Sequence, residues 1–166
     1  MSEIAIDFLL GPEWSSRLIA WWGEGYGGYS HCASVLKDGR YLDARNDVIA
    51  GVPAGVHIRH PDTEKWIKKR RATLQVTQGE YDDWEANLRA KITDGYGHID
   101  IVSFITGRNL HEDGHWICSA LAINALQHIR VIPYPLPVLA HQISPNTALL
   151  IVAAAGFMID PEVIGA

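Results

Sequence analysis

Residues 115–122 read His115-Trp116-Ile117-Cys118-Ser119-Ala120-Leu121-Ala122, and they open an apolar run that continues to Ile129. No proline or glycine interrupts this run before Pro133. A stretch of this length that is apolar on most of its surface predicts a buried helix. Cys118 falls in the first turn, where backbone N–H groups have no partner within the helix. The pattern therefore predicts a thiol at the start of a buried helix.

A thiol at this place is either a nucleophile or a packing residue. The thiolate is the reactive form, and the pKa of a free cysteine is about 8.5. Lowering that pKa to about 7 needs roughly 2 kcal/mol, at about 1.4 kcal/mol per unit. An exposed helix terminus supplies only about 0.3–1 kcal/mol, so a second cation such as a histidinium is required. Without that cation, a cysteine in an apolar helix is a packing residue.

Length and composition are those of an ordinary globular chain. The 166 residues fit one domain that spans residues 1–166. Hydrophobic residues make up 48% and charged residues 20%, which is typical of soluble proteins. A net charge of −5 argues against a nucleic-acid-binding protein, which would carry a basic patch or stripe. The short basic cluster from Lys65 to Arg71 is interpreted as a solvated turn.

The cysteine count and the N-terminus bear on the cellular compartment. Cys32 and Cys118 are too few for a disulfide framework, although a single bridge between them stays open. The apolar segment at residues 4–10 is interrupted by Asp7 and is too short for a secretory signal. No stretch approaches the length of a transmembrane helix. We therefore expect a cytoplasmic protein, with no expectation about its oligomeric state.

The remaining sequence predicts an α+β fold, with strands mainly in the first half and helices mainly in the second. The alternation of apolar and polar residues predicts strands at residues 4–10, 30–36, 40–45, 55–59 and 72–77. Helical spacing predicts helices at residues 14–22, 80–92 and 117–129, and Ser144-Pro145, a cap followed by a first-turn proline, predicts the start of a further helix that covers residues 148–155. Between them we expect a glycine-rich loop at 23–28, a polar connection at 61–71 with a helical turn near Trp66, an apolar segment at 99–105 and a loop at 107–114.

The second and third strands predict a β-hairpin around Asp38-Gly39. A two-residue loop would place His31 on one face with Leu42. A three-residue loop, with Gly39 in the left-handed conformation, places His31 on the same face as Asp43. The three-residue loop separates apolar from polar residues better, and we favour it. It sets Asp43 diagonally across from His31, within reach of a side-chain hydrogen bond.

Eight histidines are available as the base that a nucleophilic Cys118 needs. His31 is favoured because it begins a strand and has an acceptor in Asp43. The carboxylate would take the proton of one ring nitrogen and leave the other nitrogen for the thiol. The predicted catalytic residues are therefore Cys118, His31 and Asp43.

A metal site is the rival chemistry. His111, His115 and Cys118 have a spacing that can hold zinc. A fourth ligand is not evident, although Glu112 and Asp113 are close in the sequence. We therefore predict no metal and no cofactor.

Several segments, taken in order, resemble the circularly permuted branch of the NlpC-type, papain-like cysteine peptidases, in which the histidine strand precedes the cysteine helix. The matching segments are Asp7–Leu10, Leu18–Trp21, Tyr29–Val35, Tyr41–Ala44, Trp116–Ser119 and Ile143–Pro145. The separation of His31 and Asp43, 43 − 31 = 12 positions, is typical of the family's histidine and its orienting partner. The sequence departs from the family at Ala120, where an acidic residue is common, and in using aspartate at position 43.

This resemblance covers residues 5–152 and implies a papain-like fold, with a small antiparallel sheet packed against the helix of Cys118. It implies a cysteine peptidase or amidase that works through a thioester without a cofactor, on amides such as those of bacterial cell-wall peptides, in a bacterial or phage setting. A lipid acyltransferase or thioesterase of the same fold is one alternative, since relatives of the lecithin retinol acyltransferase type move acyl chains. A non-catalytic binding or structural module is the other.

Overall fold

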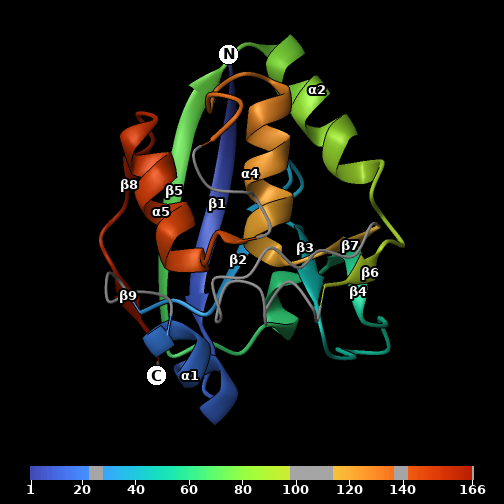
Figure 1. The fold of residues 1–166 in the computed structure, drawn as a ribbon, viewed down its shortest axis with the longest axis vertical. Helices are drawn as coiled ribbons and strands as arrows, with labels where there is room; N and C mark the ends of the chain where they lie inside the picture. Colours follow the sequence, from blue (N-terminus) through green and yellow to red (C-terminus); the bar gives the residue numbers. More distant parts are fainter. Residues whose placement is uncertain (23–27, 98–113, 137–141, 166) are drawn as a thin grey trace.

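A computed structural model of the chain describes residues 1–22, 28–97, 114–136 and 142–165. The fold is α+β, with an antiparallel sheet and several helices (Figure 1), as the sequence predicts. In chain order the elements are β1 (Ser2–Leu10), α1 (Trp14–Trp22), β2 (His31–Val35), β3 (Tyr41–Arg45), β4 (Gly55–Arg59), the 3-10 helix η1 (Pro61–Thr63), β5 (Lys68–Val76), α2 (Gln78–Arg89), β6 (Gly95–Tyr96), β7 (His115–Trp116), α4 (Cys118–His128), α5 (Pro145–Ala154), β8 (Met158–Ile159) and β9 (Val163–Ile164).

The main sheet has seven strands in the order β4-β3-β2-β1-β5-β8, and β9 also pairs with β5. Each of these pairs is antiparallel. The central strand β1 is buried from Ile4 to Leu9. A strand covered on both faces reads as a nearly continuous apolar run, and here the run is broken only by Asp7. The short strands β6 and β7 form a separate parallel pair.

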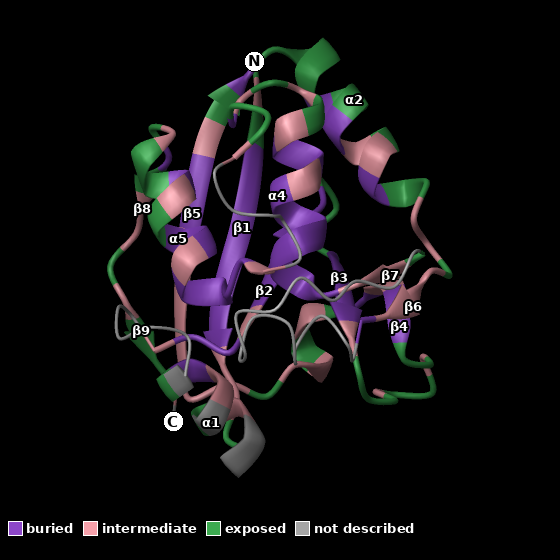
Figure 2. Ribbon diagram, in the orientation of Figure 1, coloured by how far each residue is buried: buried purple, intermediate pink, exposed green. Residues whose placement is uncertain are grey.

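Helices α2, α4 and α5 lie on one face of the sheet (Figure 1). In α4 the residues from Cys118 to Leu126 are buried, except for the half-buried Asn124. Figure 2 shows this helix and β1 as the buried centre of the molecule. The predicted buried helix is confirmed, and its apolar side chains form one core with residues of the sheet such as Ile6 and Leu42. Burying a side chain of this kind stabilises the fold by about 1.5–3 kcal/mol.

The hairpin between β2 and β3 has the predicted three-residue loop. Gly39 has φ +82°, and its N–H donates to the carbonyl of Leu36 at 2.8 Å. Only a left-handed residue closes this turn without strain, which is why a glycine occupies the position. Ser34 lies opposite Leu42 in the resulting register. This register places Asp43 on the same face of the sheet as His31.

The interpretation of the basic cluster as a solvated turn is wrong. Strand β5 begins at Lys68, so residues 68–71 pair with β1 instead of forming a turn. The reason is charge compensation, because Arg71 donates two hydrogen bonds, of 2.6 and 2.8 Å, to the buried carboxylate of Asp7. Lys69 extends over the ring of Trp66, 5.2 Å from its centroid. The expected helical turn near Trp66 is also displaced, to η1.

Two further predictions about helices are confirmed. Helix α1 has the predicted bounds, and Ser144 caps α5 by accepting from the N–H of Thr147, as a Ser-Pro helix start implies.

Other predictions concern segments that the structure does not describe. Most of the glycine-rich loop, the apolar segment 99–105 and nearly all of the loop 107–114 lie outside the described residues, as does His111. Strands β6 to β9 were not predicted. Within the described ranges, none of the helices has the length and apolar character needed to cross a membrane.

Candidate active site

The start of β2 and the start of α4 meet at one end of the sheet (Figure 1). His31 is the first residue of β2, and Cys118 is the first residue of α4. The Cys118 thiol lies within hydrogen-bonding reach of the His31 imidazole. Two residues that are 87 positions apart in the sequence, 118 − 31 = 87, are therefore brought together by the packing of the helix on the sheet.

The other side of the His31 ring contacts Asp43. Nε2 of His31 lies 2.8 Å from Oδ2 of Asp43, so the predicted hydrogen bond is confirmed. The imidazole side chain is 13% exposed and the carboxylate is fully buried. Because Nε2 is taken by the carboxylate, Nδ1 is the nitrogen that remains for the thiol. The structure thus brings together the three residues that the sequence analysis selected.

The electrostatics of the three groups favour an ion pair. Burial of the His31 ring lowers its pKa, but the Cys118 thiolate and the Asp43 carboxylate raise it by more, to about 10. Burial raises the pKa of Asp43, whereas the hydrogen bond from His31 and the nearby charges of His31 and Arg59 lower it below its usual value. The folded protein therefore favours a protonated imidazole between two anions.

A second thiol, that of Cys32, lies beside Cys118. The neighbouring Cys32 thiol and the charge of His31 lower the pKa of Cys118 well below its ordinary value. The interaction with Cys118 and burial raise the pKa of Cys32. Cys118 is the thiolate of the two because it faces the imidazole and stands at a helix N-terminus. Neither cysteine forms a disulfide bond, so the bridge between Cys32 and Cys118 that the sequence left open is absent.

Two polar residues, one in α4 and one in α5, hold the starts of α4 and β2 in place. Ser119 donates through Oγ to the carbonyl of Ile143, which ties the start of α4 to the segment before α5. Asn146 in α5 accepts from the N–H of Tyr29 at 2.7 Å and donates to the carbonyl of Ala20 at 3.1 Å. Both polar side chains are buried, so these bonds fix the main chain close to Cys118 and His31.

Arg59 and Tyr96 also belong to the site, and the sequence analysis identified neither. Arg59 in β4 is buried and donates through Nη1 to Oδ1 of Asp43. Tyr96 in β6 has its pKa raised by burial and by the nearby Cys118 thiolate. The signal for Arg59 lay in the register of β3 and β4, which puts position 59 diagonally across from position 43. A single sequence does not display that register.

A cleft of about 390 Å³ opens beside His31 and Tyr96. Its walls include charged side chains that come from β3, from the loop after it and from the segment after η1, namely Arg45, Asp47, Glu64 and Lys65. Arg45 forms ion pairs with Asp47 and with Glu64. The cleft is therefore a polar space with direct access to the imidazole.

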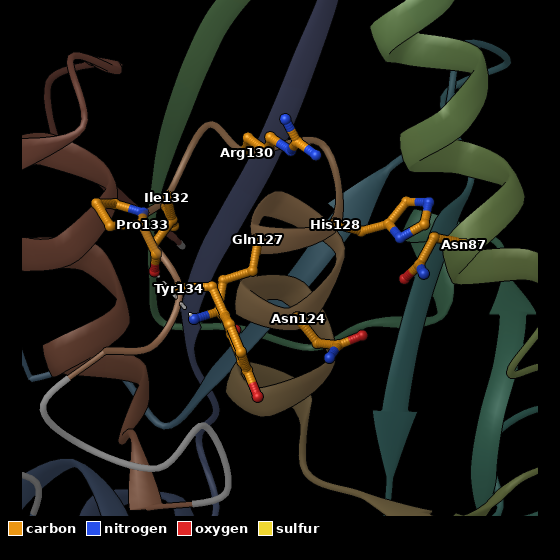
Figure 3. A pocket seen from close by; sticks show the side chains of 8 residues that line it. All are labelled: Asn87, Asn124, Gln127, His128, Arg130, Ile132, Pro133 and Tyr134. Atoms are coloured by element: carbon orange, nitrogen blue, oxygen red, sulfur yellow. Dashed lines mark hydrogen bonds between the residues drawn. The ribbon is translucent and has the colours of Figure 1, made fainter.

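A larger hollow, of about 670 Å³, lies at the other end of α4 (Figure 3). Gln127 and His128 of the last helical turn and Tyr134 of the following segment line it. At 1.5 Å per residue, His128 lies roughly 15 Å along the helix axis from Cys118. The hollow is thus remote from the thiol, and the smaller cleft is the candidate substrate site.

One group of possible metal ligands occurs among the described residues, formed by His31, Asp43 and Glu64. Two of its three members are already neutralised, since Asp43 pairs with Arg59 and Glu64 with Arg45. Guanidinium groups beside both carboxylates oppose the binding of a cation. His115 and Cys118, from the rival zinc reading, do not appear in this group. The donor set therefore fits an acid–base role better than a metal site.

No model of a known protein family matches this chain, and a search of curated proteins finds no match either. The class of site rests on geometry: an α+β protein in which a thiol, an imidazole and a buried carboxylate stand in sequence at one end of an antiparallel sheet.

Proposed function

We propose that this protein is a cysteine hydrolase, with Cys118 as nucleophile, His31 as general base and acid, and Asp43 as the residue that orients the imidazole. One observation carries the proposal: His31 lies between the Cys118 thiol and the Asp43 carboxylate, with Nε2 2.8 Å from Oδ2 of Asp43. This is the arrangement that an activated thiol requires, a nucleophile beside a base that is held by a third group.

The first half of the reaction is acylation. The Cys118 thiolate attacks the substrate carbonyl carbon and forms the C–S bond. The tetrahedral intermediate then collapses, and the amine leaves with the proton that the His31 imidazolium carries. The products are the free amine and a thioester on Cys118. Backbone N–H groups of the first turn of α4, including that of Cys118, are the donors available to the oxyanion.

The second half is hydrolysis of the thioester. His31, now neutral, takes a proton from a water molecule as the water oxygen attacks the carbonyl. The C–S bond breaks, the carboxylic acid leaves and the thiolate–imidazolium pair is restored. Asp43 keeps the ring in one orientation through both halves, because its carboxylate holds Nε2 while Nδ1 exchanges the proton.

The cleft favours a peptide amide as the substrate. Its walls carry Arg45, Asp47, Glu64 and Lys65, which are suited to polar and charged groups of a peptide. A long acyl chain would bring apolar surface against these charges, which lose hydration without compensation. We therefore place a peptidase or amidase, with cell-wall-type peptides as the first substrates to examine, ahead of a lipid acyltransferase.

The order of the elements supports the same assignment. The strand of His31 precedes the helix of Cys118 in the chain, and the helix packs on the antiparallel sheet. This is the order of the circularly permuted NlpC-type, papain-like fold that the sequence resembles, and we propose that fold for the chain.

The test is trapping of the thioester. The protein is incubated with a panel of short peptides that contain the amide types of bacterial cell walls, and in parallel with acylated lipids in vesicles, and is then quenched in acid. Mass spectrometry should find an acyl adduct on the Cys118 peptide with the peptide panel and none in Cys118→Ala. Adducts from the lipids alone would move the function to acyl transfer. Product formation that persists in Cys118→Ala would refute the nucleophile.

A further inference from the structure

The buried side chain of Arg59 stands behind the Asp43 carboxylate. The two oxygens of Asp43 have different partners: Oδ2 is hydrogen-bonded to Nε2 of His31, and Oδ1 accepts from Nη1 of Arg59. Nη1 also lies 3.3 Å from the main-chain carbonyl of Asp43. The side chain of Arg59 is only 2% exposed, so this contact is shielded from solvent and from salt.

The guanidinium is itself fixed by the main chain around β4. Nη2 of Arg59 donates to the carbonyls of Pro53 and Gly55, at 3.1 and 3.3 Å, while Nη1 approaches the carbonyl of His57 at 3.5 Å. A planar guanidinium group whose two terminal nitrogens are both hydrogen-bonded has little freedom to rotate. It therefore fixes the plane of the Asp43 carboxylate, and with it the direction of Oδ2 toward His31.

The charge of Arg59 matters as much as its geometry. A buried carboxylate without a cation favours its neutral form. His31 alternates between charged and neutral forms during the proposed reaction, so it is a cation beside Asp43 for only part of the cycle. Arginine stays charged throughout. Arg59, with a smaller contribution from Arg45, thus keeps Asp43 ionised when the imidazole has given up its proton.

We propose that Arg59 is a positioning residue for the Cys118–His31 pair, which acts through Asp43 by fixing the orientation and the negative charge of its carboxylate. This inference rests on the proposed function, since it assigns a fourth member to the same site. It extends the site to β4, from which neither the nucleophile, the base nor the orienting group comes.

Other groups around Asp43 and His31 must stay constant in any test. The titratable or charged ones among the described residues are Arg45, Asp47, His57, Glu64, Tyr96 and the two cysteines. Substitution of Arg59 leaves all of them in place. A matched control exists in Arg71, which pairs with the buried Asp7 on the same sheet but has no histidine beyond it.

The experiment measures the rate at which iodoacetamide alkylates Cys118 from pH 5 to pH 10, with the labelled peptide identified by mass spectrometry. In Arg59→Met, the acid limb of the rate profile should move up by about one pH unit, and the rate at a pH on that limb should fall about tenfold, because Asp43 without Arg59 is less readily ionised and less well oriented, and so supports the imidazolium less. Arg59→Lys should recover part of the loss. Arg71→Met should leave the profile unchanged even where it lowers the melting temperature.

Folded Arg59→Met with the profile of the wild type would overturn the inference. If Arg59→Met does not fold, Arg59→Lys decides: an acid limb shifted in the same direction supports the role, and an unchanged limb refutes it. Failure of the proposed function would give a different result. The pH profile of Cys118 alkylation would then be the same in the wild type and in His31→Ala, whatever the effect of the Arg59 variants.

Discussion

Two buried aspartates on this sheet are bound by arginines, yet only one of them faces a histidine. Asp7 on β1 accepts from both Nε and Nη2 of Arg71 and from the hydroxyl of Tyr41, at 2.6, 2.8 and 2.6 Å. Asp43 on β3 accepts from Arg59 with one oxygen and from His31 with the other. Both aspartates alternate with apolar positions that pack against α4, so their side chains lie on the opposite face of the sheet, with Ala5, Leu9 and Tyr41.

The difference between the two lies in what the second oxygen contacts. Both oxygens of Asp7 are held by arginine, with the Tyr41 hydroxyl as a further donor, and these groups keep their protons at neutral pH. One oxygen of Asp43 is held in the same way, and the other contacts the ring of His31, which titrates and has a thiol on its far side. The buried aspartate–arginine pair at Asp7 is therefore purely structural, whereas the pair at Asp43 supports the histidine of a candidate active site.

The largest contrast is expected from removing the negative charge of each aspartate. Asp43→Asn should lower the rate of hydrolysis of any peptide that the wild type cleaves by about 10²–10⁴-fold, because an amide can hold His31 in the wrong tautomer. Asp7→Asn should leave that rate within about twofold while it lowers stability. Peptide cleavage followed by mass spectrometry, with circular dichroism as a check of folding, distinguishes them. Equal losses in both variants would mean that the effect is structural.

The arginines should differ in the free energy of unfolding. Arg59→Met leaves a fully buried carboxylate without its permanent cation, which costs about 3–5 kcal/mol. Arg71 is 38% exposed, and Asp7 keeps Tyr41 and the more distant Lys69, so Arg71→Met should cost less. Urea denaturation of both variants measures the two costs. A larger loss in Arg71→Met would reverse the ranking of the two pairs.

The pH dependence of stability should separate the histidine from the rest of the network. The His31 ring holds its proton up to a pKa of about 10 in the folded chain and about 6.5 when unfolded. Its contribution to stability is thus complete below pH 6.5 and is lost as the pH rises through about 10. The wild type should melt at a higher temperature than His31→Gln, and this difference should be about 2–8 °C larger at pH 7 than at pH 10.5. That change corresponds to roughly 1–2 kcal/mol of stability. A difference that does not change with pH would argue against the ion pair.

The smallest effect is expected in the turn that sets the register of the site. Gly39 has φ +82°, and a Cβ there would meet no atom within 4 Å. Gly39→Ala should therefore cost only about 1 kcal/mol of backbone strain, without a clash. Asp43 should keep its contact with His31, so the alkylation rate of Cys118 should stay the same. Thermal melting and labelling check this, and a large fall in labelling would show that the hairpin register had shifted.

Local sequence signals predicted the parts of the site that depend on one turn or one helix. Asp38-Gly39 and the separation of faces placed Asp43 beside His31, and an apolar run without glycine or proline placed Cys118 at a helix start. Lys68–Arg71 were misread because a charged run lies in a strand only when its charges find partners, and Asp7 is 64 positions away from Arg71. Arg59 was missed for the same reason, since its contact with Asp43 exists only in the register of two strands.

The central claim is that Cys118 and His31 form a thiolate–imidazolium pair, and the pH dependence of Cys118 alkylation in the wild type and in His31→Ala tests it most directly. Such a pair should give rapid labelling of the wild type well below pH 8, and labelling of His31→Ala that rises only near the ordinary thiol pKa of about 8.5. Slow labelling of both proteins, rising near pH 8.5 and indifferent to His31, would contradict it and leave Cys118 as a packing residue.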